Sequence, residues 1–242
     1  MNYNSNILYK YVALDIGESI VITSTLKFTN PLKFNDPFDC NILRLKFDLT
    51  TIDPVVKAEV SFLREKFGND PRVTDELLQT GYEKGQIDKI KKSSVCCFSH
   101  IPDNLLMWAH YSNKHFGACL IFDNSVADKF ISVPDTRLTE GTVDYAPFTI
   151  INYLENKVEG IKKLFTTKSI DWEYENEYRI IILEQEGLVR FNPKFLTGII
   201  FGMNAGDDEI KRFQNACSRE KIDLSYKKAI KDRDKLKIID LV

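Results

Sequence analysis

The chain lacks the features that mark several common protein classes. Its 33 basic and 35 acidic side chains leave a net charge of −2, so no overall field attracts nucleic acid or anionic lipid. No apolar run approaches the ~20 residues of a transmembrane helix, and Met1 to Asn6 lack the basic and apolar regions of a signal peptide. We therefore predict a cytoplasmic protein without membrane contact, in which any contact with nucleic acid is local.

Cysteine is sparse as well, and several motifs are missing. The five cysteines are odd in number and form no C-x-x-C pair, so we predict buried free thiols and no zinc site. The sequence contains no G-x-x-x-x-G-K-[ST], G-x-G-x-x-G or G-x-S-x-G. These absences argue against a P-loop NTPase, a Rossmann dehydrogenase and an α/β-hydrolase.

Histidine is the scarcest of the residues that commonly carry chemistry. The chain has three, His100, His110 and His115, and they lie together between two apolar runs. On a helical stretch over 104–111, His110 has Trp108 and Tyr111 beside it, which suits an acid, base or substrate anchor with an aromatic stacking surface. The alternative is a hydrogen-bonded histidine of the core. The spacing of the three does not fit a metal site, and we expect no metal.

The pattern of apolar residues predicts an α+β fold. With 43% hydrophobic residues, 242 positions suffice for a substantial core, and no repeat or linker divides the chain, so we predict a single domain over 1–242. We expect a mixed β-sheet, continuous or split, flanked by helices, with a helical insertion at about 53–92. The expected strands are 7–12, 26–29, 94–98, 118–123, 142–145, 178–183, 187–191, 196–202, 224–227 and 236–240. The expected helices are 15–24, 53–66, 74–92, 150–165 and 207–221.

A second group of candidate residues precedes and enters an apolar strand. In an extended chain Glu175, Glu177 and Arg179 share one side, because residues two apart do so. Carboxylates beside an arginine suit acid/base work or the stabilisation of a developing cation. If the segment is helical instead, Glu175 and Arg179 form an ordinary surface pair. The neighbouring Trp172 and Tyr174 favour the first interpretation.

A third group lies in a loop that two prolines, Pro31 and Pro37, make rigid. Within it Asn35, Asp36 and Asp39 are placed to bind a ribose hydroxyl or a cation. The alternative is a capped turn in which the aspartates accept hydrogen bonds from their own backbone.

Taken in order, the motifs of this chain resemble a bacterial family known only as domain of unknown function 2971. The residues that carry the resemblance are Leu8-Tyr9-Lys10-Tyr11, Asn30-Pro31, Phe34 to Asp39, Cys97-Phe98-Ser99, Leu106 to Tyr111, Gly117, Phe122-Asp123, Trp172, Tyr174-Glu175 and Glu177-Tyr178-Arg179. The resemblance implies a small bacterial protein, often encoded near mobile or phage-defence loci, but no activity.

A more distant similarity is to ADP-ribosyltransferases. Those enzymes have a split sheet with a basic or histidine residue on an early strand, a serine or tyrosine on a middle strand and a glutamate on a late strand. Here Tyr9-Lys10-Tyr11, then Ser99, then Glu175 or Glu177 follow that order. This similarity implies NAD as substrate and cleavage of its nicotinamide glycosidic bond, with Glu177 as the first candidate for the functional carboxylate.

Three functions are therefore compatible with the sequence. The first is an NAD-using transferase or glycohydrolase, a toxin or phage-defence effector with a nucleic-acid or protein target and a neutralising partner protein. The second is a metal-dependent nuclease or phosphodiesterase that uses Asp36, Asp39, His110, Glu175 and Glu177. The third is a non-catalytic sensor that binds a nucleotide or a phage protein. The transferase requires that the strands around Lys10, Ser99 and Glu177 meet at one cleft.

Overall fold

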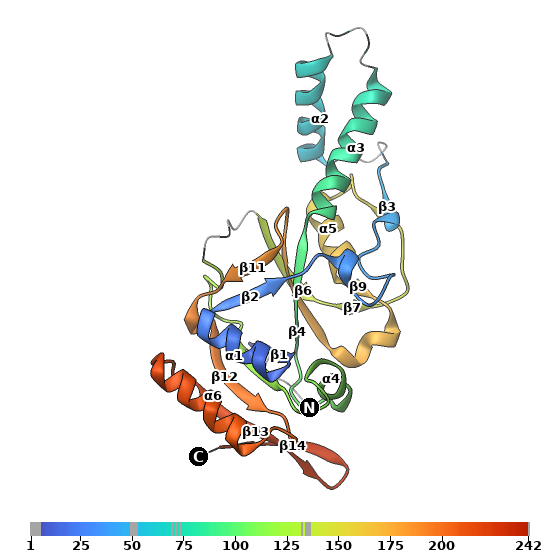
Figure 1. The fold of residues 1–242 in the computed structure, drawn as a ribbon. Helices are drawn as coiled ribbons and strands as arrows, with labels where there is room; N and C mark the ends of the chain where they lie inside the picture. The colour runs from blue at the N-terminus through green and yellow to red at the C-terminus, as the bar shows by residue number, and fades with distance from the viewer. Residues whose placement is uncertain are drawn as a thin grey trace.

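The computed structural model describes residues 6–48, 53–68, 70, 72, 74–131, 133 and 137–241. The residues Met1 to Ser5, on which the prediction about a signal peptide depends, lie outside the described residues. Figure 1 shows a large twisted sheet with helices on its faces and a helical hairpin that stands away from it.

The principal sheet has eight strands in the order β14-β13-β12-β5-β1-β4-β10-β6. In that order the strands are Lys235–Asp240, Ser225–Asp232, Leu196–Phe201, Ala118–Asp123, Ile7–Val12, Ser94–Ser99, Glu177–Ile182 and Leu138–Thr142. Neighbours are antiparallel except β12 and β13, which are parallel, so the predicted mixed sheet of an α+β protein is confirmed.

Three two-stranded sheets accompany it within the described part of the chain. They pair β2 (Thr25–Phe28) with β11 (Gly187–Arg190), β3 (Leu45–Lys46) with β8 (Ile151–Asn152), and β7 (Asp144–Tyr145) with β9 (Thr167–Lys168). Short 3-10 helices occupy Pro31–Lys33, Ile42–Arg44, Ile170–Glu175 (η4) and Pro193–Phe195.

The principal sheet opens at its centre, between β1 and β4. Strand β1 pairs with β5 along its whole length, whereas the described residues of β1 pair with β4 at Tyr9↔Ser99 alone. Near the other end of β4, Val95 pairs instead with Thr29, the residue that follows β2. The Lys10 ammonium occupies the opening and donates a hydrogen bond to the main-chain oxygen of Cys97, 2.9 Å away. A carbonyl that has no strand partner there is thereby satisfied.

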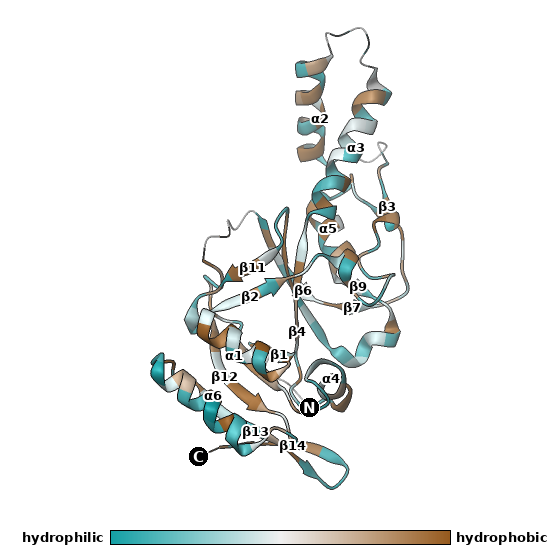
Figure 2. Ribbon diagram, viewed as in Figure 1, coloured by the Kyte–Doolittle hydropathy of each residue, from teal (hydrophilic) through white to brown (hydrophobic). Residues whose placement is uncertain are grey.

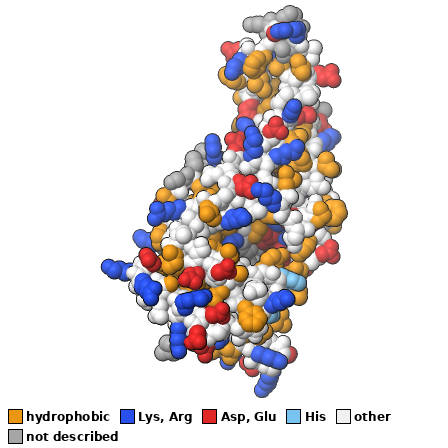
Figure 3. All heavy atoms as spheres, viewed as in Figure 1, with side chains coloured by type: hydrophobic (Ala, Val, Ile, Leu, Met, Phe, Trp, Pro, Cys, Tyr) orange, Lys and Arg blue, Asp and Glu red, His pale blue; other side chains and the backbone are white. Residues whose placement is uncertain are grey.

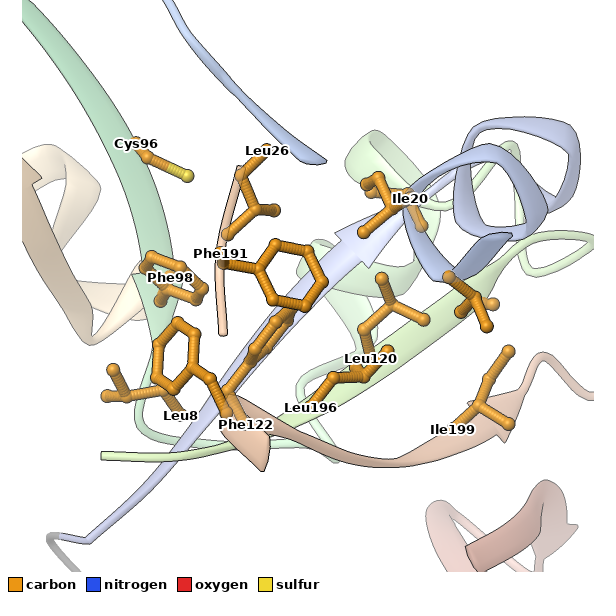
Figure 4. Close-up of a cluster of buried hydrophobic side chains, with 14 of the residues drawn as sticks. Leu8, Ile20, Leu26, Cys96, Phe98, Leu120, Phe122, Phe191, Leu196 and Ile199 are labelled. Atoms are coloured by element: carbon orange, nitrogen blue, oxygen red, sulfur yellow. The ribbon is translucent and has the colours of Figure 1, made fainter. Parts of the chain in front are cut away.

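Side chains alternate between the two faces of this sheet, as the pleat requires. One face packs against α1 (Leu14–Thr23), α6 (Asp207–Arg219) and the β2–β11 pair, and Leu8, Phe98, Leu120 and Phe122 meet Phe191 and Ile20 there (Figure 4). The other face packs against α4 (Leu105–Tyr111) and α5 (Lys157–Thr166). Ser99 of β4 and Glu177 and Arg179 of β10 lie on this second face, because they alternate in step with Val95 and Ile181, which pack there.

The predicted helical insertion is a hairpin of α2 (Pro54–Phe67) and α3 (Asp75–Lys91). Helix α2 begins as the sequence indicates, because the Asp53 side chain accepts a hydrogen bond from the amide of Val55 and Pro54 occupies the first turn. Figure 2 shows apolar and polar residues interspersed along both helices. None of the helices in the described part of the chain combines the length and the apolar character needed to cross a lipid bilayer.

One predicted helix is wrong over its first half. The expected helix 150–165 begins only at Lys157, because the Asn156 side chain caps it by accepting a hydrogen bond from the amide of Glu159. Upstream, Ile151 and Asn152 form β8 instead. The expected strand 142–145 is divided, because Thr142 ends β6 in the principal sheet whereas Asp144 and Tyr145 form β7, which pairs with β9. The other predicted helices and strands are present, with differences at their ends; the last hairpin is longer than expected, since β13 continues to Asp232.

Candidate functional site

A cavity of about 180 Å³ lies where β1 and β4 separate, on the face of the sheet that carries α4 and α5. Ten of the predicted site residues line it: Tyr9, Lys10, Tyr11, Asn35, Asp39, Ser99, Tyr111, Glu175, Glu177 and Arg179. The remaining lining residues are Phe34, Cys97, Phe98, Met107 and Lys168. Residues from four distant parts of the sequence, including Lys10, Ser99 and Glu177, therefore meet at one cavity.

Arg179 organises the charged wall of this cavity. Its guanidinium is fully buried and donates to both oxygens of Asp39 at 2.8 and 2.6 Å, and to both oxygens of Glu177 at 3.0 and 2.9 Å. A further bond of 2.7 Å reaches the main-chain oxygen of Phe165 at the end of α5. Because the guanidinium is planar, these paired bonds fix both carboxylates in one geometry.

Lys168 is the charged residue among the lining residues that were not predicted from the sequence. Its Nζ atom lies 2.5 Å from Glu175 Oε2 and 3.3 Å from Glu177 Oε2, and 4.8 Å from the centre of the Trp172 ring. The side chain is buried and reaches the cavity because β9 pairs with β7 directly after α5 ends. One ammonium group thus separates two carboxylates that would otherwise repel each other.

Glu175 is held by a different set of partners. Its Oε1 atom accepts a hydrogen bond of 2.5 Å from the Tyr111 hydroxyl, and its main-chain oxygen accepts one of 2.7 Å from Ser99 Oγ. Asn176 follows in the left-handed conformation, with φ of 45°, and this turn lets Glu175 and Glu177 both face the cavity.

The alternative in which Glu175 and Arg179 form an exposed helical pair is therefore wrong. Glu175 and Glu177 are each 4% exposed and Arg179 is 0% exposed, and Arg179 lies within β10 rather than on a helix. The three side chains converge on one wall, but the extended interpretation is correct only for Glu177 and Arg179, which lie in β10, because Glu175 is the last residue of the 3-10 helix η4.

The charges in this wall shift several pKa values. Burial raises the pKa of Glu177, but the positive charges of Arg179 and Lys168 outweigh it and lower that pKa to about 2. Burial lowers the pKa of Lys168, and the charges of Glu177 and Glu175 reverse this and raise it. Burial and the hydrogen bond to Glu175 both raise the pKa of Tyr111, so its hydroxyl keeps its proton at neutral pH.

Three predicted residues are not among those that line the cavity. His110 lies exposed on α4. Trp108 is fully buried and donates its indole N–H to the main-chain oxygen of Pro102, 2.7 Å away, so no ligand can stack on it. Asp36 forms the capped turn that was its alternative, since its Oδ1 atom accepts from the amide of Phe38. His100 bonds to Thr142, 3.1 Å away, and the three histidines do not assemble into one site.

Positive side chains are paired with the carboxylates of the cavity. In the described part of the chain no group of three or more His, Cys, Asp or Glu side chains is placed to hold one. Asp39, Glu175 and Glu177 do approach one another, but Arg179 and Lys168 already supply the positive charge between them. What this wall offers instead is a set of rigid hydrogen-bond acceptors beside the aromatic rings of Tyr9, Phe34, Phe98 and Tyr111.

Comparison with known families finds one match. Residues 107–180 match the family model described as protein of unknown function (DUF2971). This segment is a DUF2971 segment. The match confirms the family resemblance for the motifs within these residues, and the motifs before residue 107 lie outside it. A comparison with curated proteins found no match, and a comparison with solved structures found none either.

The DUF2971 segment contains much of the charged wall. Tyr111, Lys168, Glu175, Glu177 and Arg179 all lie within it. Lys10, Asp39 and Ser99, which also line the cavity, come from earlier parts of the chain. The cavity is therefore completed by strands β1 and β4 and by the loop that carries Asp39.

Proposed function

We propose that this protein is an NAD-using effector, a toxin or phage-defence protein that transfers ADP-ribose to a protein or nucleic-acid target or hydrolyses NAD. The observation that carries the proposal is the meeting of Lys10, Ser99 and Glu177 at one cavity, on strands that separate at that point. ADP-ribosyltransferases have a split sheet that carries a basic residue on an early strand, a serine on a middle strand and a glutamate on a late strand. Lys10, Ser99 and Glu177 follow the same order here.

The chemistry of the cavity fits cleavage of a glycosidic bond. Loss of nicotinamide leaves positive charge on the ribose, and a fixed carboxylate close to it stabilises that charge more than mobile water does. Glu177 is ionised at neutral pH and cannot swing away, because Arg179 binds both of its oxygens. The aromatic walls are suited to a flat ring such as nicotinamide.

Two alternatives are less well supported. A metal-dependent nuclease would use Asp36, Asp39, His110, Glu175 and Glu177, but Asp36 and His110 do not line the cavity and Arg179 binds Asp39 and Glu177. A non-catalytic sensor would bind a nucleotide or a phage protein in the same cavity without forming a product. Rigid, charged acceptors are compatible with binding alone, so product formation is the measurement that separates the sensor from the enzyme.

The proposal extends to the setting in which the protein acts. All five cysteines are free thiols, and four are buried, which is the usual state in the reducing cytoplasm. We place the protein there. A cytoplasmic enzyme that consumes NAD endangers its own cell, so we also propose a partner protein that neutralises it.

The test is replacement of the proposed carboxylate. Purified wild-type protein should consume NAD with release of nicotinamide, and Glu177→Gln should reduce the rate by about 100-fold or more, since a positioned charge in a dry site is worth that much. Glu59→Gln is the matched control, because Glu59 also bonds to a lysine and a tyrosine but lies outside the cavity. Thermal unfolding verifies that both variants fold. Wild-type turnover by folded Glu177→Gln contradicts the proposal.

A further inference from the structure

Tyr111, Glu175 and Lys168 form a continuous hydrogen-bonded series at the cavity. The Tyr111 hydroxyl donates to one oxygen of Glu175 and the Lys168 ammonium donates to the other, each at 2.5 Å. All three side chains line the cavity. A hydroxyl, a carboxylate that can take its proton and a third group that orients the carboxylate are the parts of an activated nucleophile.

We propose that the Tyr111 hydroxyl is a nucleophile that accepts the ADP-ribosyl group within this site. The inference rests on the proposed function. The Tyr111 oxygen attacks the anomeric carbon of the nicotinamide ribose, and the bond from that carbon to the nicotinamide nitrogen breaks. The nitrogen keeps the bonding pair and leaves as neutral nicotinamide, while the hydroxyl proton moves to Glu175. The product is ADP-ribose in a covalent bond to the tyrosine.

The state of the hydroxyl explains why the carboxylate is needed. Because the pKa of Tyr111 is raised, the phenol does not ionise by itself at neutral pH. Glu175 is already in contact with its proton, and Lys168 holds Glu175 in place from the other side. Glu177 cannot serve this role, since Arg179 occupies both of its oxygens.

Two other hydroxyl groups that line the cavity, those of Ser99 and Tyr11, donate to main-chain oxygens and not to a carboxylate. Ser99 Oγ donates to the main-chain oxygen of Glu175, and the Tyr11 hydroxyl donates to the main-chain oxygen of Ile101 at 2.7 Å. A carbonyl oxygen is too weak a base to accept the proton of either group in a reaction. Of these three hydroxyl groups, Tyr111 is the one whose proton is held by a carboxylate.

The molecule contains its own control for this assignment. Tyr82 donates a hydrogen bond of 2.7 Å to Glu59, which in turn binds Lys157 at 2.8 Å. This is the same succession of tyrosine, glutamate and lysine, but it lies between α2, α3 and α5 and not in the cavity. If the cavity and not the local hydrogen bonds determines reactivity, Tyr111 reacts and Tyr82 does not.

The experiment uses full-length protein in excess over NAD, quenched with acid during the first turnover, followed by mass spectrometry of the intact chain and its peptides. We expect one ADP-ribosyl group on the wild-type chain, on the peptide that contains Tyr111. Tyr111→Phe removes only a hydroxyl and should abolish the adduct. Glu175→Gln should reduce it about 100-fold, the size of a general-base contribution. Tyr82→Phe should leave it unchanged.

The outcomes separate this inference from the proposed function. If the wild type releases nicotinamide but carries no adduct at Tyr111, the inference is overturned and the proposed function stands. Equal modification of Tyr82 also overturns it, because the cavity would then have no part in the choice of residue. If the wild type releases no nicotinamide, the proposed function is wrong, and the inference that Tyr111 is a nucleophile is wrong with it.

Discussion

Arg179 is the side chain on which the charged wall of the cavity depends. It is fully buried and joins Asp39, from a loop, to Glu177, from β10, through paired hydrogen bonds. A buried ion pair adds little stability over a well-packed apolar pair, but removal of one partner leaves the other charge buried and uncompensated.

We therefore predict that Arg179→Met lowers the free energy of unfolding by about 3 to 5 kcal/mol, as measured by urea denaturation. The control is Lys33→Met, which breaks the ion pair with Glu186. The side chains of that pair are 64% and 36% exposed, and the loss should be at most about 1 kcal/mol. Equal losses in the two variants would contradict the structural role of Arg179.

The lowered pKa of Glu177 makes stability depend on pH. The folded value is about 2 and the ordinary value is 4.5, so the folded state favours the ionised form. Its contribution, about 3 kcal/mol, is complete above pH ~4.5 and is lost as the pH falls towards 2. We predict that Glu177→Gln flattens the fall in unfolding free energy over this range, measured by denaturation at a series of pH values. A fall as steep as in the wild type would contradict the assignment.

The charged wall also shows how far single residues can be predicted from the sequence. Strand alternation, which is a local rule, places Glu177 and Arg179 on one side of β10. Glu175 ends η4 and reaches the same wall through the left-handed turn at Asn176, which strand alternation does not predict. Lys168 follows from no local rule, because the pairing of β7 with β9 brings it to the cavity. Asp39 was expected to meet a ligand, and it meets Arg179, a residue 140 positions away in the chain.

At the scale of elements, α4 positions Tyr111 through its buried side. Trp108 on this helix is 0% exposed and lies against Tyr11 of β1, with ring centres 5.3 Å apart. His110 lies on the exposed side of the same helix, away from the residues that line the cavity. The cluster of three histidines thus lies beside the cavity, and the residues of α4 that line the cavity are Met107 and Tyr111.

This placement predicts opposite results for two neighbouring substitutions. Trp108→Ala should lower the free energy of unfolding by about 3 to 5 kcal/mol, because it leaves a large cavity beneath α4. His110→Ala should change it by less than about 0.5 kcal/mol, as is usual for surface positions. Thermal unfolding and nicotinamide release measure both effects. A folded His110→Ala protein without turnover would restore His110 to the catalytic residues.

Helices and strands were predicted correctly where a short stretch of sequence is enough to indicate them. Apolar runs gave the central strands, and the Asp53-Pro54 pair gave the start of α2. The helix predicted from residue 150 failed because Asn156, a capping residue with Glu159 three positions later, was not used as a start signal. A continuous and a split sheet both stayed open at the level of the sequence, and the position of the opening between β1 and β4 was not predicted; the bridge between Thr29 and Val95, which lies beside it, joins residues far apart in the chain.

At the scale of the whole molecule, buried apolar side chains are unevenly distributed. The central strand β5 is buried along almost all of its length, and its neighbours cover both edges. The α2–α3 hairpin contributes Val56, Tyr82 and Ile90 to the core at its base, whereas Val55, Phe62, Phe67 and Leu77 are exposed. Figure 3 shows hydrophobic side chains at the surface of the hairpin, among charged ones.

Regions with few buried contacts open locally at a lower free energy than the core does. We therefore predict that amides in α2 from Ser61 to Phe67 exchange with deuterium well before those of β5, as measured by hydrogen-exchange mass spectrometry on the full chain. The amides around Tyr82 and Ile90 in α3 should exchange more slowly than this part of α2, because their side chains are anchored in the core. Protection of α2 equal to that of β5 would contradict the prediction, and it would mean that the exposed apolar residues of the hairpin are covered in solution.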